Sequence, residues 1–210
     1  MRMIIIFDRE NLINVSELLQ TKKITTNDYV NEINKNIDNH NYLSALTLAL
    51  MIPDICSKNI NDNGNLGYVK WFNKYVYRTY YDIPNSKQIK KVPQKLRKIY
   101  KVKFNGTTCY ALRNAVLHSG TSFVNYKKDN DRIKANVDHI ELCVNSKSEG
   151  DFQYGESVSI ITDNYDETKV TIRINVVNFC MTMIKGYYDF LKDIGKNDIQ
   201  LFYMIDWDNK

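Results

Sequence analysis

The segment that most constrains the fold runs from Tyr42 to about Ser57, because apolar side chains surround this predicted helix on nearly every side. A helix that is hydrophobic nearly all round belongs in the interior of a protein. Pro53 lies inside it and removes one backbone donor, so we expect a kink or a restart there. The apolar residues of the segment are Leu43, Leu46, Leu48, Ala49, Leu50, Ile52 and Ile55. We therefore expect the core to form around this helix.

Helical spacing of apolar residues, or a helix-start signal, marks other parts of the chain as well. A polar loop from Asn59 to Gly67 separates two of them, and residues 197–207 are aromatic without a clear pattern. The further expected helices are a short amphipathic one within residues 1–23, a polar one from Thr25-Thr26-Asn27-Asp28 to about Asp38, one from Tyr68 to Tyr80, one over residues 106–120, and one from Val176 to about Asp193. Together they predict a helical bundle.

The pattern changes between Gly120 and the last helix, where apolar and polar residues alternate as they do in strands. The alternating apolar residues are Ile140, Leu142 and Val144, then Val158 and Ile160, then Val170, Ile172 and Ile174. Asp163-Asn164-Tyr165-Asp166 supplies a plausible hairpin turn. We therefore expect a small antiparallel β element, inserted over residues 136–175, before the last helix.

The chain is long enough for one domain and no longer than one domain requires. It has 210 residues, of which 43% are hydrophobic and 25% are charged, and this balance is typical of globular proteins. We predict a single, mostly α domain over residues 1–210, with residues 1–23 as an N-terminal extension.

Two classes of protein are disfavoured by the pattern. The longest apolar run, Met3 to Phe7, is far shorter than the roughly 18 to 20 residues of a membrane span. Cys56, Cys109, Cys143 and Cys180 lie far apart and form no CxxC pair, so neither a disulfide frame nor a zinc site is indicated. We expect a cytoplasmic protein with reduced, packing cysteines, without a metal, a cofactor or a membrane partner.

The formal net charge is +5, and many of the basic residues lie in one lysine-rich stretch between Lys87 and Lys103. Such a cluster attracts a polyanion such as RNA, although a solvated surface produces the same pattern. The residues proposed to contact an RNA backbone are Lys90, Lys91, Lys95, Arg97 and Lys98. Tyr77, Tyr80 and Tyr81 are candidates to stack on unpaired bases, or else they belong to the core.

One of the three histidines lies in a pattern that indicates chemistry. His40 and His139 have no accompanying ligand or carboxylate pattern, whereas His118 ends the helix predicted over residues 106–120. Thr107 or Thr108 is expected to cap the start of this helix, and Gly120 its end.

Arg113 and Asn114 lie on the same predicted helix as His118. Asn114 and His118 are four residues apart and so share a face, and Arg113 begins about 100° round the helix with a stem long enough to reach the same cleft. The three side chains are a phosphate binder, a proton-transfer group and an amide to orient them.

These parts suit metal-free RNA cleavage by attack of a 2′-hydroxyl on the adjacent phosphate. The imidazole moves the proton and the guanidinium stabilises the charge that develops on the phosphate. One histidine cannot be base and acid at the same instant, but pairing with a second copy across a two-fold axis supplies another.

The Arg113-Asn114-x-x-x-His118 arrangement resembles the signature of the HEPN superfamily. Two stretches, residues 45–56 and 109–120, also resemble one bacterial branch of that superfamily, with residues 68–72 between them. The resemblance implies a helical bundle that dimerises through the motif helix. It also implies a metal-independent endoribonuclease of toxin–antitoxin or phage-defence systems, with RNA and an antitoxin as possible partners. One branch carries a tyrosine where this chain has Gly120, so control through such a tyrosine is not expected.

Two alternatives from other functional classes stay open. A non-catalytic dimer of the same fold would bind RNA or a nucleotide through Arg113 without turnover. In a plain interaction module, the motif helix would be only a dimer interface. Under that reading Arg113 pairs with an acidic neighbour and His118 satisfies a helix end.

Overall fold

The computed structural model describes residues 21–62, 64–81, 104–120, 139–144, 152–154, 158–162 and 170–205, and most of these residues are helical. The mostly α fold predicted from the sequence is therefore confirmed. The chain divides into two compact units, the smaller formed by residues 1–31 with 198–210 and the larger by residues 32–197.

The smaller unit contains an antiparallel pair of strands, β1 (Thr21–Thr25) and β6 (Gln200–Ile205), which the sequence pattern did not predict. Helix α2 (Thr26–Asp38) follows β1 directly. Its start is fixed by Asp28, whose carboxylate accepts hydrogen bonds from the Thr25 backbone N–H at 3.0 Å and from the Thr25 hydroxyl at 3.1 Å. These bonds hold the pKa of Asp28 below its usual value. The helix-start signal read from the sequence is confirmed.

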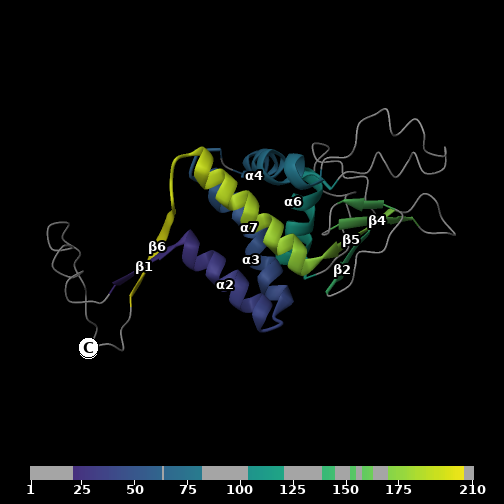
Figure 1. Cartoon of the computed structure of the whole chain (residues 1–210), viewed down its shortest axis with the longest axis horizontal. Coiled ribbons are helices and arrows are strands. Elements are labelled where there is room, and N and C mark those ends of the chain that lie inside the picture. Colours follow the sequence, from purple (N-terminus) through teal and green to yellow (C-terminus); the bar gives the residue numbers. More distant parts are fainter. Residues whose placement is uncertain are drawn as a thin grey trace, which may run out of the picture. The chain divides into compact units, whose positions relative to one another are not determined.

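The centre of the larger unit is α3 (Tyr42–Lys58), which packs against helices that come before and after the undescribed segments. Its neighbours are α4 (Gly64–Phe72), α6 (Gly106–Asn114) and α7 (Val176–Asp193), as Figure 1 shows. Ala45, Leu46, Ala49 and Leu50 are fully buried, so the prediction of a core helix is confirmed. The helix continues through the buried Pro53, and the restart considered at that residue is not seen.

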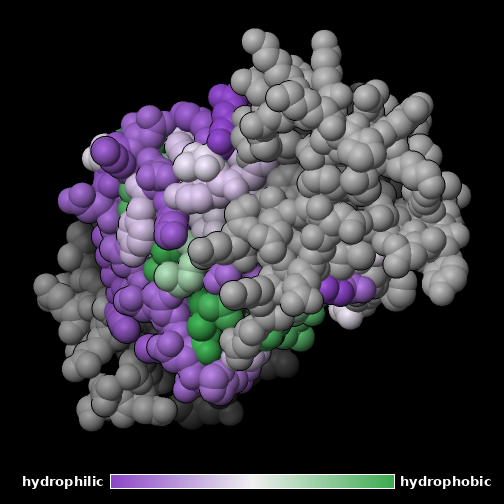
Figure 2. All heavy atoms as spheres, turned by 45° about the vertical axis from the view of Figure 1, so that its right-hand side comes forward, coloured by the Kyte–Doolittle hydropathy of each residue, from purple (hydrophilic) through white to green (hydrophobic). Residues whose placement is uncertain are grey.

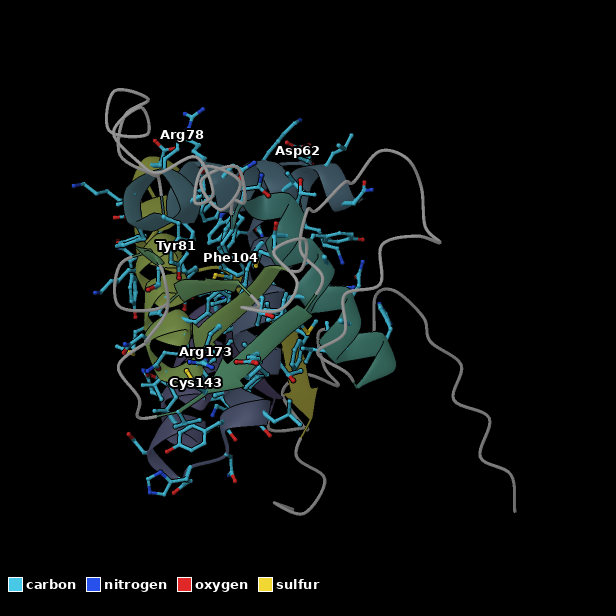
Figure 3. All side chains as sticks on the ribbon, turned by 90° about the vertical axis from the view of Figure 1, so that its right-hand side faces the viewer. Asp62, Arg78, Tyr81, Phe104, Cys143 and Arg173 are labelled. Atoms are coloured by element: carbon cyan, nitrogen blue, oxygen red, sulfur yellow. The ribbon has the colours of Figure 1, made fainter. Side chains whose placement is uncertain are left out.

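Aromatic rings fill the space between α7 and the helices on one side of it. α4 continues into a π-helical segment, η1 (Asn73–Tyr81), so the helix predicted from Tyr68 to Tyr80 is confirmed. It begins earlier than predicted, at Gly64, so the last part of the predicted Asn59–Gly67 loop is helical. Tyr81 of η1 meets Phe104 edge to face, with 5.5 Å between the ring centroids. Both residues are labelled in Figure 3. Tyr81 is only 1% exposed, so its proposed role in stacking a base is wrong. Tyr77 and Tyr80 are half-buried.

A four-stranded sheet precedes α7. It consists of β2 (His139–Cys143), β3 (Phe152–Tyr154), β4 (Val158–Thr162) and β5 (Val170–Asn175), in the order β2-β5-β4-β3. The predicted antiparallel pairing is right for β3, β4 and β5, whereas β2 pairs with β5 in parallel. Alternation of apolar residues identifies a strand but carries no information on its direction. The turn expected over residues 163–166 lies outside the described residues.

The sheet is joined to the helices through β5, one of its two inner strands. β5 leads directly into α7, and Asn175 caps that helix by accepting a hydrogen bond from the Asn178 backbone N–H at 3.1 Å. Arg173 of β5 and Cys143 of β2 lie on neighbouring strands (Figure 3), and Arg173 pairs with Glu141 of β2 at 2.8 Å. This ion pair links the parallel strand to the rest of the sheet.

Several large apolar side chains are exposed on the surface that the structure describes. Figure 2 shows a face on which hydrophilic side chains predominate, with a smaller group of hydrophobic ones among them. The large apolar side chains exposed in the described ranges are Leu43, Ile60, Leu66, Leu142, Met181, Tyr188, Phe202 and Tyr203. None of the described helices is both long and apolar enough to cross a membrane.

Candidate functional site

The helix that carries the motif begins at a well-defined cap. The Asn105 side-chain oxygen accepts hydrogen bonds from the backbone N–H groups of Thr107 at 3.1 Å and Thr108 at 3.2 Å. Asn105 is therefore the capping residue, and the assignment of that role to Thr107 or Thr108 is wrong. Asparagine is as effective a cap as threonine or better, and its extended backbone (φ −92°, ψ −177°) is the usual one for this position.

The first turn of α6 lies directly against the α4–η1 helix. The Gly106 N–H donates to the Asn73 side-chain oxygen at 2.8 Å. A Cβ atom at Gly106 would lie 2.4 Å from the Val69 backbone oxygen and 2.9 Å from its Cα. Only glycine allows this approach, so the position of α6 is fixed by backbone packing at its start.

A buried hydrogen-bond chain holds the inner side of α6 against α3 and α4. The Tyr68 hydroxyl donates its one proton to the Leu50 carbonyl at 3.1 Å, so the Cys109 thiol, 3.3 Å away, donates to the Tyr68 oxygen. Burial raises the pKa of both groups well above their ordinary values. Cys109 is therefore a neutral packing residue beneath the site and not a nucleophile.

Arg113, near the end of α6, is held by a carboxylate from α3. Its Nε and Nη2 groups lie 3.2 and 3.0 Å from Asp54 Oδ2, and the two side chains are only 19% and 20% exposed. Arg113 Cζ also lies 5.8 Å from the centre of the Tyr110 ring, which meets Tyr68 at 5.2 Å. The guanidinium is thus oriented by a carboxylate on α3 and an aromatic ring on its own helix.

Sequence reasoning did not select Asp54 as a site residue. It is the one carboxylate in a helix whose other residues are mostly apolar, and a carboxylate in such a helix needs a partner. That isolation was a usable signal for a pairing. It did not identify Arg113 as the partner, because the pairing joins residues 59 positions apart.

The last part of the motif helix is π-helical. η3 (Ala115–Ser119) ends at Gly120, whose φ of +58° is left-handed and whose N–H donates to the Ala115 carbonyl five residues back. The predicted role of Gly120 at the helix end is therefore confirmed. In a π turn the backbone N–H of one residue donates to the carbonyl five residues earlier, so the turn is wider than an α-helical one.

The π turn changes which pair of motif residues meets. The helical spacing predicted Asn114 and His118 on one face, with Arg113 reaching round to them. In the structure Arg113 Nη1 lies 3.0 Å from His118 Nε2, five residues on, and 3.0 Å from Asn114 Oδ1. The three predicted residues come together, with Arg113 at the centre.

The Arg113–His118 contact fixes the imidazole tautomer. A guanidinium has donors only, so Nε2 of His118 accepts and the ring proton lies on Nδ1. The His118 side chain is exposed, whereas Asn114 and Arg113 are half-buried. The arrangement presents a fixed cation beside an imidazole that faces solvent, as binding and proton transfer at a phosphate require.

The other candidate residues contribute nothing to this site among the residues that the structure describes. All five basic residues proposed for the RNA backbone, Lys90 to Lys98, lie outside the described residues. His139 begins β2, and His40 lies in a turn where its Nδ1 is 2.7 Å from the Tyr42 hydroxyl. Within the described ranges, no cluster of three or more histidine, cysteine, aspartate or glutamate side chains is placed to bind a metal ion.

Comparison of the whole chain with protein-family models, with curated proteins and with solved structures gives no match.

Proposed function

We propose that the chain is a metal-independent endoribonuclease that acts as a homodimer. The observation that carries the proposal is the position of Arg113 Nη1, 3.0 Å from both Asn114 Oδ1 and His118 Nε2. A phosphate binder, an orienting amide and a proton-transfer group are thus within hydrogen-bond reach of one another.

The proposed reaction is attack of an RNA 2′-oxygen on the adjacent phosphorus. The 2′-hydroxyl loses its proton, the new P–O bond forms, and the bond to the 5′-oxygen breaks as that oxygen gains a proton. The products are a 2′,3′-cyclic phosphate and a 5′-hydroxyl. His118 carries out one of the two proton transfers, each typically worth about 10² to 10⁴ in rate.

Arg113 supplies the charge for the transition state, and the residues round it supply its orientation. Asp54 binds the Nε edge of the guanidinium, so Nη1 stays directed at His118 and Asn114. A cation held in place before the reaction stabilises developing negative charge without reorganisation. Asp54 is accordingly a positioning residue in this proposal.

The homodimer follows from the second proton transfer. One imidazole cannot accept and donate a proton in the same step, and a two-fold axis beside the motif helix brings in a second His118. Sedimentation of the purified chain tests this directly. A monomer at the concentrations where RNA is cleaved would contradict the dimer.

The nuclease is tested by cleavage of end-labelled RNA and tRNA in EDTA. We expect Arg113→Ala and His118→Ala each to lower the rate at least 10²-fold, with wild-type products that end in 2′,3′-cyclic phosphate. Arg78→Ala, at an exposed arginine of η1, is the matched control for the first variant. His40→Asn is the control for the second, because asparagine tolerates the positive φ of that turn.

Two results would count against the nuclease. Cleavage that persists in both site variants would mean that another group, or a contaminant, does the chemistry. No cleavage of any RNA by a folded wild-type dimer would favour a non-catalytic dimer that binds RNA or a nucleotide. One observation favours the plain interaction module instead: Arg113 pairs with Asp54, the kind of acidic neighbour that this alternative predicts.

The cellular role is proposed on the resemblance of the motif alone. A toxin or phage-defence effector would arrest growth when expressed, and His118→Ala would relieve the arrest. An antitoxin encoded with it would restore growth of the wild type. Growth unaffected by the active enzyme would exclude the toxin role and leave the nuclease in place.

A further inference from the structure

We infer that Arg113 and His118 form a latch, and that a phosphate group which binds Arg113 opens the latch and frees His118 for proton transfer. The inference deepens the proposed nuclease function, on which its catalytic meaning rests. The contact itself is a property of the site, whatever the reaction.

The latch is inferred from the N–H donors of the Arg113 guanidinium, most of which already have an acceptor. Arginine has five N–H donors in a rigid plane. Nε and one N–H of Nη2 bind Asp54, and the two N–H groups of Nη1 reach Asn114 and His118. Only the second N–H of Nη2 has no partner among the described residues. A phosphate that takes two donors must therefore displace a group already bound.

His118 is the group that gives way. Asp54 is a charged acceptor in a part-buried pair, and Asn114 is the next residue on the same helix. His118 is exposed and offers a neutral ring nitrogen. The bond from Arg113 to Asp54 joins two opposite charges, whereas the bond to His118 joins a charge to a neutral nitrogen, so a phosphate oxygen displaces the imidazole before it displaces the carboxylate.

The exchange decides when His118 can react. While Nε2 accepts from Arg113, its lone pair cannot take a proton from a 2′-hydroxyl. Nε2 also cannot carry a proton for the leaving oxygen, because the guanidinium donates to the same position. Binding of a phosphate at Nη1 removes this block at the moment when the reacting group is seated. The same guanidinium therefore binds the substrate and controls the proton-transfer group.

The first test follows the His118 ring nitrogens by ¹⁵N NMR at mildly alkaline pH, with inorganic phosphate as the probe. We expect the Nδ1–H tautomer in the wild type, with an Nε2 signal that moves on addition of phosphate. In Arg113→Ala the Nε2 signal should already lie at its displaced position and not respond to phosphate. His40, which lies in the turn between α2 and α3, supplies the control signal. An Nε2 signal that ignores both the mutation and phosphate would overturn the latch.

The second test measures affinity for a 2′-deoxy oligonucleotide, which binds but cannot be cleaved. We expect His118→Ala to bind it roughly 3- to 10-fold more tightly than wild type, the range that loss of one competing hydrogen bond gives. His118→Gln keeps an acceptor for Arg113 and should bind about as the wild type does. Equal or weaker binding by His118→Ala, or no binding of phosphate or oligonucleotide by any variant, would overturn the proposal.

These readouts separate the latch from the nuclease. If the NMR and affinity results hold and no RNA is cleaved, the nuclease fails and the latch stands as the control of an anion site. If RNA is cleaved in an Arg113- and His118-dependent way but the Nε2 signal is unresponsive, the latch fails and the nuclease stands.

Discussion

The two parts of the motif helix are built differently, although they are continuous in sequence. α6 is a regular helix with a side-chain cap, a glycine against the α4 backbone and a buried inner face. η3 is a π-helical turn with an exposed histidine and a left-handed glycine in open space at its end. The contrast teaches that Arg113 takes its position from the core, whereas His118 takes its position from Arg113.

This division suits a site in which one group must be fixed and the other must move. A cation that stabilises a transition state works best when it is already in place. A proton-transfer group has to leave one partner and meet another. Wide π turns occur disproportionately at functional sites. Here the turn connects Arg113, which must be fixed, to His118, which must move.

The largest expected effect on stability comes from Gly106, at the start of α6, which is the fixed part of the motif helix. Gly106→Ala places a Cβ only 2.4 Å from the Val69 backbone oxygen, which cannot rotate aside as a side-chain atom could. We expect a loss of roughly 3 kcal/mol in the free energy of unfolding, at the upper end for an overpacked core. Urea titration followed by circular dichroism measures it. A loss under 1 kcal/mol would mean that α6 is not fixed at its start.

The second effect tests how Arg113 is held. Asp54→Ala removes the carboxylate and leaves a part-buried guanidinium, so we expect a loss of roughly 2 kcal/mol in stability and a larger fall in cleavage rate than stability explains. Asp54→Asn keeps an acceptor oxygen and should recover part of both. Asp62→Ala, which breaks an exposed pair with Lys70, is the control and should change little. An equal effect of the two alanine variants would show that Asp54 is only a surface charge.

Sequence reasoning predicted the fold well where one helix or strand carries its own pattern. The last helix was predicted over Val176–Asp193, and α7 has those bounds. The core helix was predicted to within about one residue. The β1–β6 pair was missed because none of its described side chains is buried, so no alternation of buried and exposed residues marks either strand.

The site shows the same boundary between local and long-range information. Arg113, Asn114 and His118 lie within six residues, and their meeting could be predicted from a helix. The π turn that makes Arg113 and His118 direct neighbours could not, because it depends on packing of the whole segment. Asp54 and Asn73 contact α6 from helices far earlier in the chain, and no local pattern connects them to it.

The third effect concerns the cap of α6. Asn105→Ala removes the acceptor for two backbone N–H groups, and we expect it to cost about 1 kcal/mol in stability. Asn105→Asp should retain most of it, since a carboxylate oxygen also accepts both bonds and suits the positive end of the helix dipole. Thermal unfolding of the three proteins measures the order. A neutral Asn105→Ala would transfer the capping role back to the threonines that follow.

The smallest expected effect on stability comes from Gly120, at the end of η3, which is the adaptable part of the motif helix. Gly120 has φ of +58° with nothing within 4 Å of a Cβ atom, so Gly120→Ala introduces backbone strain but no clash. The strain of a left-handed alanine is about 1 kcal/mol, and fraying of the exposed last turn relieves part of it, so the loss in stability should stay below that value. Asparagine tolerates this conformation, and Gly120→Asn should cost less still.

Gly120→Ala should nevertheless lower the cleavage rate, through His118, by more than its small effect on stability would explain. When η3 frays, the hydrogen bond from Gly120 to Ala115 is lost, and so is the turn that brings His118 to Arg113. We expect Gly120→Ala to lower the cleavage rate several-fold at nearly unchanged melting temperature, whereas Asn105→Ala should lower the melting temperature with a smaller effect on the rate. If both variants changed rate and stability in the same proportion, η3 would be no more adaptable than α6, and the two parts of the motif helix would act as one rigid element.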